Sequence, residues 1–311
     1  MLRAVWLGDK AAFDACYRWS ETHLRRKEDS LLAWHWKDGK ITDSMPAADA
    51  DIDYALSLLQ AEARWPGQAP EGLAPYGARG LQSAEDILRL LTFRAGSRLH
   101  LSPWILRPKA EAPFPVNPSY YSPAHFRVFH RASGDARWRE LAETSYHILG
   151  ELSKGFQGRR GVGLFPDWCS VDAAGKLGKY RKKNTGSGWE AVRIPFRVGL
   201  DHAWFRRPEA AAVLGPLAAF AAGEWSRTGK IFCEYGYDGK PVKEYENPAF
   251  YAAYYWALSV SDFPVAGKIL AKTRKFPDAA DSRLYGPDYF PNSLAWLGEG
   301  LASGLIQKAA P

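Results

Sequence analysis

The spacing of apolar and polar residues predicts helices over most of the chain. In residues 49–64, Ile52, Ala55, Leu56 and Leu59 recur three and four positions apart, as the buried face of a helix requires. The same periodicity, with polar capping residues ahead of several segments, predicts further helices. They cover residues 9–25, 87–94, 123–132, 136–153, 189–205, 208–226, 247–260, 262–274 and 290–306.

Long segments without periodicity separate these helices. Residues 66–80, 100–123, 155–188 and 285–292 are rich in Pro, Gly and aromatic residues, and residues 231–245 have the turn-rich pattern of a possible hairpin. Loops of this length are often functional. No βαβ alternation, phosphate-binding glycine loop or Gly-x-Ser-x-Gly is present. Paired helices with few strands favour an all-α toroid or solenoid, with an irregular all-α domain as the alternative.

Composition adds a carbohydrate cleft to this picture as one possibility. The chain of 311 residues contains 13 Trp, 15 Tyr and 15 Phe, and many of these rings stand beside Pro, Gly or Asn, as in loops. Aromatic faces in a cleft stack on sugar rings, although an aromatic-rich core is the alternative. The net charge of +7 is scattered apart from a short basic run at residues 181–183, which we interpret as a solvated loop. No nucleic-acid partner is therefore expected.

Other classes of function lack support in the sequence. Three cysteines without a Cys-x-x-Cys and seven dispersed histidines predict neither a disulfide framework nor a metal site, and no cofactor is expected. No apolar run is long enough to span a membrane, and no signal peptide opens the sequence. Residues 1–8 look like the tail of a helix that ends at Gly8. The first helix is therefore expected to be truncated, and the length of 311 residues fits one large domain or two ordinary ones.

Three junctions between a loop and a helix combine polar and aromatic residues: Asp49, residues 117–121 and residues 190–193. Asp49 suits an N-cap and Asp51 a first helical turn, whereas Asp53 is interpreted as a solvated charge. Hydrolysis of a glycosidic bond needs two carboxyl groups, roughly 6.5–9.5 Å apart in inverting enzymes. The sequence alone leaves open whether Asp49 and Glu190 meet, because either could be a charge at a helix start and nothing more.

Five segments, in order along the chain, resemble glycoside hydrolase family 8, and most closely the endo-β-1,4-glucanases of bacterial cellulose-synthesis operons. They are Leu31-Leu32-Ala33-Trp34-His35-Trp36, Ala47-Ala48-Asp49-Ala50-Asp51-Ile52-Asp53-Tyr54-Ala55, Asn117-Pro118-Ser119-Tyr120, Phe165-Pro166-Asp167-Trp168 and Trp189-Glu190-Ala191-Val192-Arg193-Ile194-Pro195. The resemblance runs from Met1 to about Gly300 and implies one catalytic domain over residues 1–311 that lacks its N-terminal segment. It also implies an (α/α)6 barrel with long aromatic loops, an inverting mechanism without metal, and a periplasmic or secreted location. The implied partners are a cellulose chain and the cellulose synthase export complex.

The resemblance also assigns catalytic roles. Asp49 corresponds to the aspartate that holds the distorted sugar at the point of cleavage, and Tyr120 to the tyrosine that helps to place the attacking water. Glu190 falls where these glucanases carry the catalytic base in a Tyr-Asp-Ala-x-Arg motif. Here the motif is Trp-Glu-Ala-Val-Arg, and the extra methylene of glutamate displaces the carboxylate outward, which affects positioning.

Further residues are implied as binding groups. Arg193 and Asn117 are expected to contact sugar or the carboxylates, Trp34 and Trp168 are expected to stack on sugar rings, and Tyr121 is expected to contact substrate.

The family's general acid is a glutamate in a Ser-Glu-Gly-Gln-x-Tyr-Gly-Met motif, and Met1 corresponds to the last residue of that motif. The acid is therefore expected upstream of this chain, and the chain alone is expected to show little or no hydrolysis, since loss of a general acid lowers rates by about 10²–10⁴-fold. One alternative is a non-catalytic glucan-binding or assembly protein. Another is a related activity on xylan, mixed-linkage glucan or chitosan, of which cationic chitosan is disfavoured by the net charge of +7.

Overall fold

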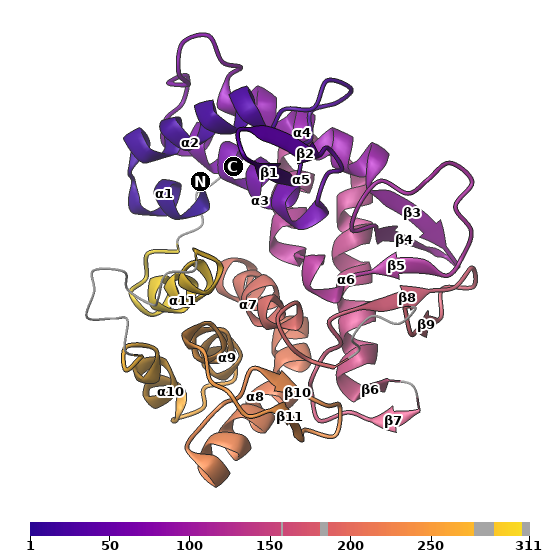
Figure 1. The fold of residues 1–311 in the computed structure, drawn as a ribbon, viewed down its shortest axis with the longest axis vertical. Coiled ribbons are helices and arrows are strands. Elements are labelled where there is room, and N and C mark those ends of the chain that lie inside the picture. The colour runs from indigo at the N-terminus through magenta and orange to yellow at the C-terminus, as the bar shows by residue number, and fades with distance from the viewer. Residues whose placement is uncertain (157, 181–185, 277–288, 307–311) are drawn as a thin grey trace.

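A ring of helices forms the centre of the molecule (Figure 1). The structure, a computed structural model, describes residues 1–156, 158–180, 186–276 and 289–306, so the predicted basic run at 181–183 and much of the predicted loop at 285–292 lie outside the described residues. The odd-numbered helices follow one another around the ring, each in contact with the next. They are α1 (Leu2–Leu7), α3 (Ala48–Arg64), α5 (Pro123–Ser133), α7 (Ile194–Phe205), α9 (Pro248–Val260) and α11 (Tyr289–Ala302).

Aromatic stacking closes the ring between its first and last helices. The ring of Trp6 on α1 stacks on Trp296 of α11 with centroids 6.2 Å apart, and Trp204 of α7 meets the edge of Trp6 at 6.3 Å. Helices α7 and α9 are buried around most of their circumference, as helices in the middle of a larger fold must be. The predicted fold class, an all-α (α/α)6 barrel, is confirmed.

The even-numbered helices pack outside this ring, against their odd-numbered neighbours. They are α2 (Lys10–His23), α4 (Tyr76–Leu90), α6 (Ala136–Lys154), α8 (Pro208–Thr228) and α10 (Ala266–Thr273). Caps set several helix starts: the carboxylate of Asp9 accepts from the N–H of Ala12, and that of Asp135 accepts from the N–H of Arg137. No helix among the described residues has both the length and the apolar character that crossing a bilayer requires.

Helix boundaries differ from the sequence prediction in several places. Helix α7 begins at Ile194 and α10 at Ala266, where starts at residues 189 and 262 were expected. Helix α4 begins at Tyr76, within the segment that was expected to be a loop, because Pro75 stands at its N-cap. The predicted helix at residues 87–94 ends by Leu90, where a hairpin begins. Helix α3 is preceded by Ala47 as N-cap, so Asp49 lies in its first turn and the predicted N-cap role of Asp49 is wrong.

Short strands organise the long loops between the helices. The predicted hairpin at residues 231–245 is confirmed as β10 (Glu234–Tyr235) with β11 (Pro241–Lys243). The other pairs are β1 (His35–Lys37) with β2 (Lys40–Asp43), β3 (Thr92–Ala95) with β4 (Arg98–Leu101), and β6 (Gly155–Phe156) with β7 (Arg159–Arg160). A three-stranded sheet is formed by β5 (Phe114–Val116), β8 (Cys169–Val171) and β9 (Leu177–Gly178).

The three-stranded sheet positions two parts of the site. Strands β5 and β8 are antiparallel, and Val116 lies opposite Cys169. Asn117 directly follows the one strand and Trp168 directly precedes the other, so the pairing places the two residues at the same end of the sheet.

Candidate active site

The starts of three ring helices converge on one groove. Asp49 lies in the first turn of α3, and Tyr120 ends the 3₁₀ turn η1 (Pro118–Tyr120) that leads into α5. The 3₁₀ turn η2 (Ala191–Arg193) leads into α7. Glu190 directly precedes this turn, and Arg193 is its last residue. These are the three junctions that the sequence singled out, and the structure brings their side chains into contact.

Arg193 joins the two candidate carboxylates. Its Nη1 donates to Oδ2 of Asp49 at 2.5 Å, and its Nη2 donates to Oε2 of Glu190. The side chains of Arg193 and Asp49 are 12% and 16% exposed, whereas that of Glu190 is 32% exposed. Although burial opposes its charge, the two carboxylates raise the pKa of Arg193. Asp49, 144 positions before Arg193 in the sequence, thus shares its guanidinium with Glu190, which charges at unrelated helix starts would not do.

Glu190 accepts a second hydrogen bond from Asn117, the residue that directly follows strand β5. Nδ2 of Asn117 donates to Oε2 of Glu190 at 2.7 Å. Oδ1 of Asn117 accepts from the N–H of Ser119 at 3.0 Å and from its hydroxyl at 2.7 Å, which leaves the amide NH₂ free to face the carboxylate. Asn117 and Arg193 therefore contact the carboxylates directly and fix where Glu190 points.

Aromatic side chains surround this charged cluster. The guanidinium of Arg193 lies 5.1 Å from the ring centroid of Tyr120, a cation–π contact. Burial, followed by the charge of Asp49, raises the pKa of Tyr120, so its hydroxyl stays protonated. A cavity of about 520 Å³ is lined by Glu190 and Tyr120 together with Trp34, Trp104 and Trp168. Trp34 is 56% exposed and so presents the ring surface that a stacking residue needs.

Tyr121 does not face this groove, unlike its neighbour Tyr120. Its side chain is fully buried, and its hydroxyl accepts from the N–H of Leu101 at 3.1 Å. The structure thus places Tyr121 in the core, where it anchors strand β4, and not at the position of the expected substrate contact.

Asp167 is a functional candidate for which the sequence gave no role, although it belongs to the segment that contains Trp168. Its Oδ1 accepts from the backbone N–H groups of Gly188, Glu190 and Ala191, at 2.9, 3.2 and 2.9 Å. This carboxylate therefore holds the turn that presents Glu190 to the groove. Burial, together with the nearby charge of Glu190, outweighs these hydrogen bonds and raises the pKa of Asp167 to about 6.

Asp167→Asn is expected to change how stability depends on pH. A carboxyl group whose pKa is higher in the folded state than in the unfolded state stabilises the fold at low pH, and this contribution falls as pH rises from about 4 to about 6. Asparagine keeps an acceptor for the three N–H groups but does not titrate. Relative to the parent, the variant should therefore gain about 2–3 kcal/mol in free energy of unfolding between pH 4 and pH 7.

Urea unfolding of both proteins at pH 4.5 and pH 7.5 measures this relative gain. A difference between the two proteins that is the same at both pH values would show that Asp167 is not the titrating group.

A second pair of charges lies one turn further along the same two helices. Nη2 of Arg197 donates to Oδ2 of Asp53 at 2.9 Å, and Nε2 of His125 lies 2.9 Å from Oδ1 of the same carboxylate. The interpretation of Asp53 as a solvated charge is therefore wrong. The reason is that its partners come from α7 and α5, far away in the sequence.

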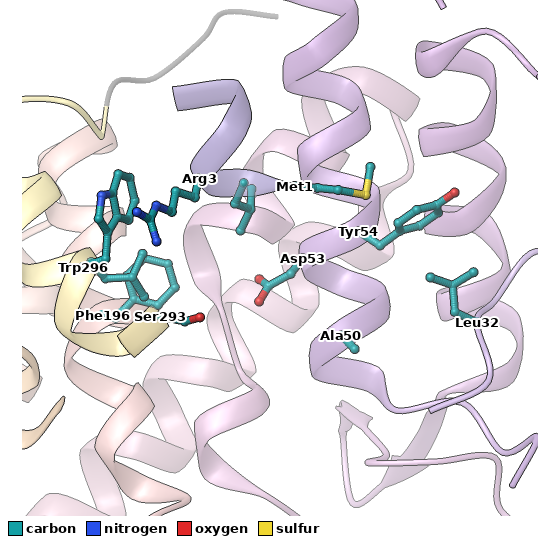
Figure 2. Close-up of a pocket in the computed structure, with 11 residues that line it drawn as sticks. Met1, Arg3, Leu32, Ala50, Asp53, Tyr54, Phe196, Ser293 and Trp296 are labelled. Carbon is teal, nitrogen blue, oxygen red and sulfur yellow. The ribbon is translucent and has the colours of Figure 1, made fainter. Parts of the chain in front are cut away.

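The carboxylate of Asp53 also faces a cavity beside Met1 (Figure 2). This cavity measures about 390 Å³, and Phe196 and Trp296 contribute to its wall. Burial raises the pKa of Asp53. The charge of Arg197 and the hydrogen bond to His125 lower it, and because these two partners outweigh the burial, the pKa lies below its ordinary value. Asp53 therefore stays charged and serves the packing of α3 against α5 and α7.

Metal ligation has no candidate site within the part of the chain that the structure describes. No group of three or more His, Cys, Asp or Glu side chains there has an arrangement that could hold an ion.

The sequence pattern of the family described as glycosyl hydrolases family 8 matches residues 1–219. Endoglucanase A of Acetivibrio thermocellus is 28% identical over 308 residues, which cover 96% of this chain and 58% of that protein. A probable endoglucanase of Novacetimonas hansenii is 30% identical over 209 residues, covering 63% of this chain and 55% of that protein. The chain spans about half the length of these curated relatives.

Solved structures match the whole ring of helices. The crystal structure of an endo-1,4-D-glucanase from Vibrio fischeri aligns with a TM-score of 0.81 and 24% identity, over 97% of this chain and 84% of that one. An endo-β-1,4-glucanase from Acetobacter xylinum aligns with a TM-score of 0.75 and 22% identity, over 98% and 87%. At these identities the structural likeness concerns the fold.

Proposed function

The chain belongs to glycosyl hydrolase family 8, and from this premise we propose that it acts as an inverting endo-β-1,4-glucanase with Glu190 as the general base. The observation that carries the proposal is the shared guanidinium: Arg193 holds Asp49 and Glu190 together beside a cavity lined with aromatic rings. A carboxylate that is partly exposed, fixed in orientation by two hydrogen-bond donors and placed on the wall of a cleft can take the proton of an attacking water.

In this mechanism each groove residue has one role. Glu190 accepts the proton of the water, while Asn117 and Arg193 fix the orientation of its carboxylate. Asp49 accepts hydroxyl hydrogens of the sugar at the point of cleavage, and protonated Tyr120 helps to place the water. Trp34, which is 56% exposed, stacks on a ring of the glycan. Trp168, expected to do the same, is buried against Trp104 and Tyr120, and so supports the groove wall instead.

The described groove residues offer no good general acid. Asp43 lines the same cavity, but hydrogen bonds from the N–H of Met45 and from the side chain of Trp34 lower its pKa, which is the opposite of what an acid needs. Asp49 is held in the ion pair with Arg193. We therefore take the acid to be the family glutamate that corresponds to a position before Met1.

The role of Glu190 as general base can be tested with a substrate whose cleavage does not need the general acid. A β-cellobiosyl fluoride needs no protonation of its leaving group, so its hydrolysis depends on the base alone. We expect the protein to hydrolyse this fluoride and to release the α-anomer, detected by NMR within minutes of mixing. Release of the β-anomer would contradict an inverting mechanism.

The rate of carboxymethyl-cellulose hydrolysis by the same preparation tests the assignment of the general acid. The 311-residue chain should hydrolyse it little or not at all, and a form extended upstream by the family motif should hydrolyse it about 10²–10⁴-fold faster. Equal rates for the two forms would refute the assignment of the acid.

A non-catalytic glucan-binding or assembly protein is the second candidate, and it is favoured by the lack of an acid among the described groove residues. Binding of cello-oligosaccharides without hydrolysis of the fluoride would support it. The remaining details of the proposal are extrapolated from the family: action on cellulose rather than xylan or mixed-linkage glucan, a periplasmic or secreted location, and work beside the cellulose synthase export complex.

A further inference from the structure

A second cavity adjoins the groove across Trp104. It measures about 590 Å³, and Trp104 lines both it and the groove cavity. Trp168 connects the two aromatic surfaces, since its ring centroid lies 5.8 Å from that of Trp104 and 6.3 Å from that of Tyr180, which lines the second cavity. A glycan that stacks on Trp34 in the groove can therefore continue along Trp104 into this second cavity, with Trp168 buried behind Trp104.

The charges of this cavity differ from those of the groove. Arg107, Lys109 and Glu111 all line it, so cations outnumber anions two to one. All three side chains are exposed, and within the described residues neither cation takes part in an ion pair. The groove, in contrast, is lined by the acidic Asp43 and Glu190. A negative group on the substrate is thus repelled near the point of cleavage and attracted one cavity away.

The loop that carries these cations has an unusual backbone conformation. Lys109 has a φ of 59°, in the left-handed region that side chains other than glycine rarely adopt. The N–H of Ala110 bonds the carbonyl of Arg107 at 3.0 Å, which closes a tight turn around Lys109. The turn keeps both cations on the same short stretch of the rim.

We propose that this cavity is a subsite for a β-1,4-linked glycan that carries a carboxylate on a ring distant from the bond being cleaved. Trp104 receives the apolar face of the sugar, and Arg107 and Lys109 bind its carboxylate. This proposal rests on the proposed glucanase function, which supplies the β-1,4-linked backbone in the groove. It goes beyond that function because it assigns a charged substituent, and a place for it, to the preferred substrate.

Binding measured by calorimetry tests the subsite. The probes are cellohexaose and the same hexasaccharide with its terminal ring oxidised at C6 to a uronic acid, both titrated into the Glu190→Gln protein so that no turnover intervenes. We expect the acidic probe to bind about fivefold tighter at low salt, the size of effect that one or two exposed ion pairs produce, and the preference to disappear at 0.5 M NaCl.

Two double variants, each of which removes two exposed cations, test whether the preference depends on Arg107 and Lys109. Arg107→Ala/Lys109→Ala should abolish the preference for the acidic probe and leave the affinity for cellohexaose within about twofold. Lys268→Ala/Lys275→Ala removes two exposed cations at helix α10, on the far side of the ring, and should retain the preference. Equal affinity for both probes, or a preference that survives the first double variant, would overturn the subsite. Binding of cellohexaose but not of the acidic probe would overturn the subsite as well, whereas failure of both probes to bind would instead overturn the proposed glucanase function.

Discussion

Replacing Glu190 with Gln is expected to lower the rate of β-cellobiosyl fluoride hydrolysis by about 10²–10⁴-fold, because an amide cannot accept the proton of the attacking water. The fluoride is the right substrate because its departure needs no acid, so the change in rate reports the base alone. Gln also keeps an oxygen that can accept from Asn117 and Arg193, so the fold and the groove should survive the change.

Two further variants make this result specific. Glu190→Asp keeps a carboxylate that can accept a proton, so this variant should retain more activity than the Gln variant. Glu151→Gln changes a glutamate that is 57% exposed on helix α6 and should leave the rate unchanged. If the Gln variant hydrolyses the fluoride as fast as the parent, Glu190 is not the base.

Helical periodicity alone predicted several elements closely. The segment expected at residues 49–64 is α3 (Ala48–Arg64), and that expected at 136–153 is α6 (Ala136–Lys154). These helices have a continuous apolar face, which a local pattern reports directly. The start of α4 at Tyr76 was missed because residues 66–80 are rich in Pro and Gly, and those residues mask a helix start when no contact with α3 is known.

The convergence of the site required the resemblance as well as the residues. Their places at junctions between a loop and a helix marked Asp49 and Glu190 as candidates, but only the ring of helices shows that one guanidinium binds both. The role of Asp167 was missed for a related reason. Its hydrogen-bond donors are backbone N–H groups 21 to 24 positions later, and no side-chain pattern encodes them. Roles that depend on distant backbone or on a partner helix are invisible to local sequence patterns.

The network at Asp53 is the clearest such case, and it carries the largest expected effect on stability. Arg197 is 4% exposed on its side chain and depends on Asp53 for its counter-charge, whereas the carboxylate itself is 35% exposed to the cavity beside Met1. His125, which is fully buried, does not add positive charge at neutral pH, because burial lowers its pKa to about 4. Removal of the Asp53 charge therefore leaves the guanidinium buried and unpaired.

Asp53→Asn is accordingly expected to lower the free energy of unfolding by about 3 kcal/mol at pH 7, the loss typical of breaking one side of a buried ion pair. The pKa of Asp53 is lowered in the folded state, so its contribution is fully present above the ordinary Asp pKa of about 4 and is lost as pH falls below that value. The difference between variant and parent should therefore be constant from pH 7 to pH 5 and shrink at pH 3.5. Urea unfolding at the three pH values measures it.

Asp238→Asn is the matched control for this effect. Asp238 forms an exposed ion pair with Lys240 at 3.6 Å, in which the two side chains are 54% and 83% exposed. Its removal should change stability by less than about 0.5 kcal/mol at pH 7. Equal effects of the two substitutions would mean that the Asp53–Arg197 pair is no more than a surface interaction. A large effect confined to Asp53 would instead establish that the second pair of charges, one turn beneath Asp49 and Arg193, stabilises the fold by linking α3 to α7.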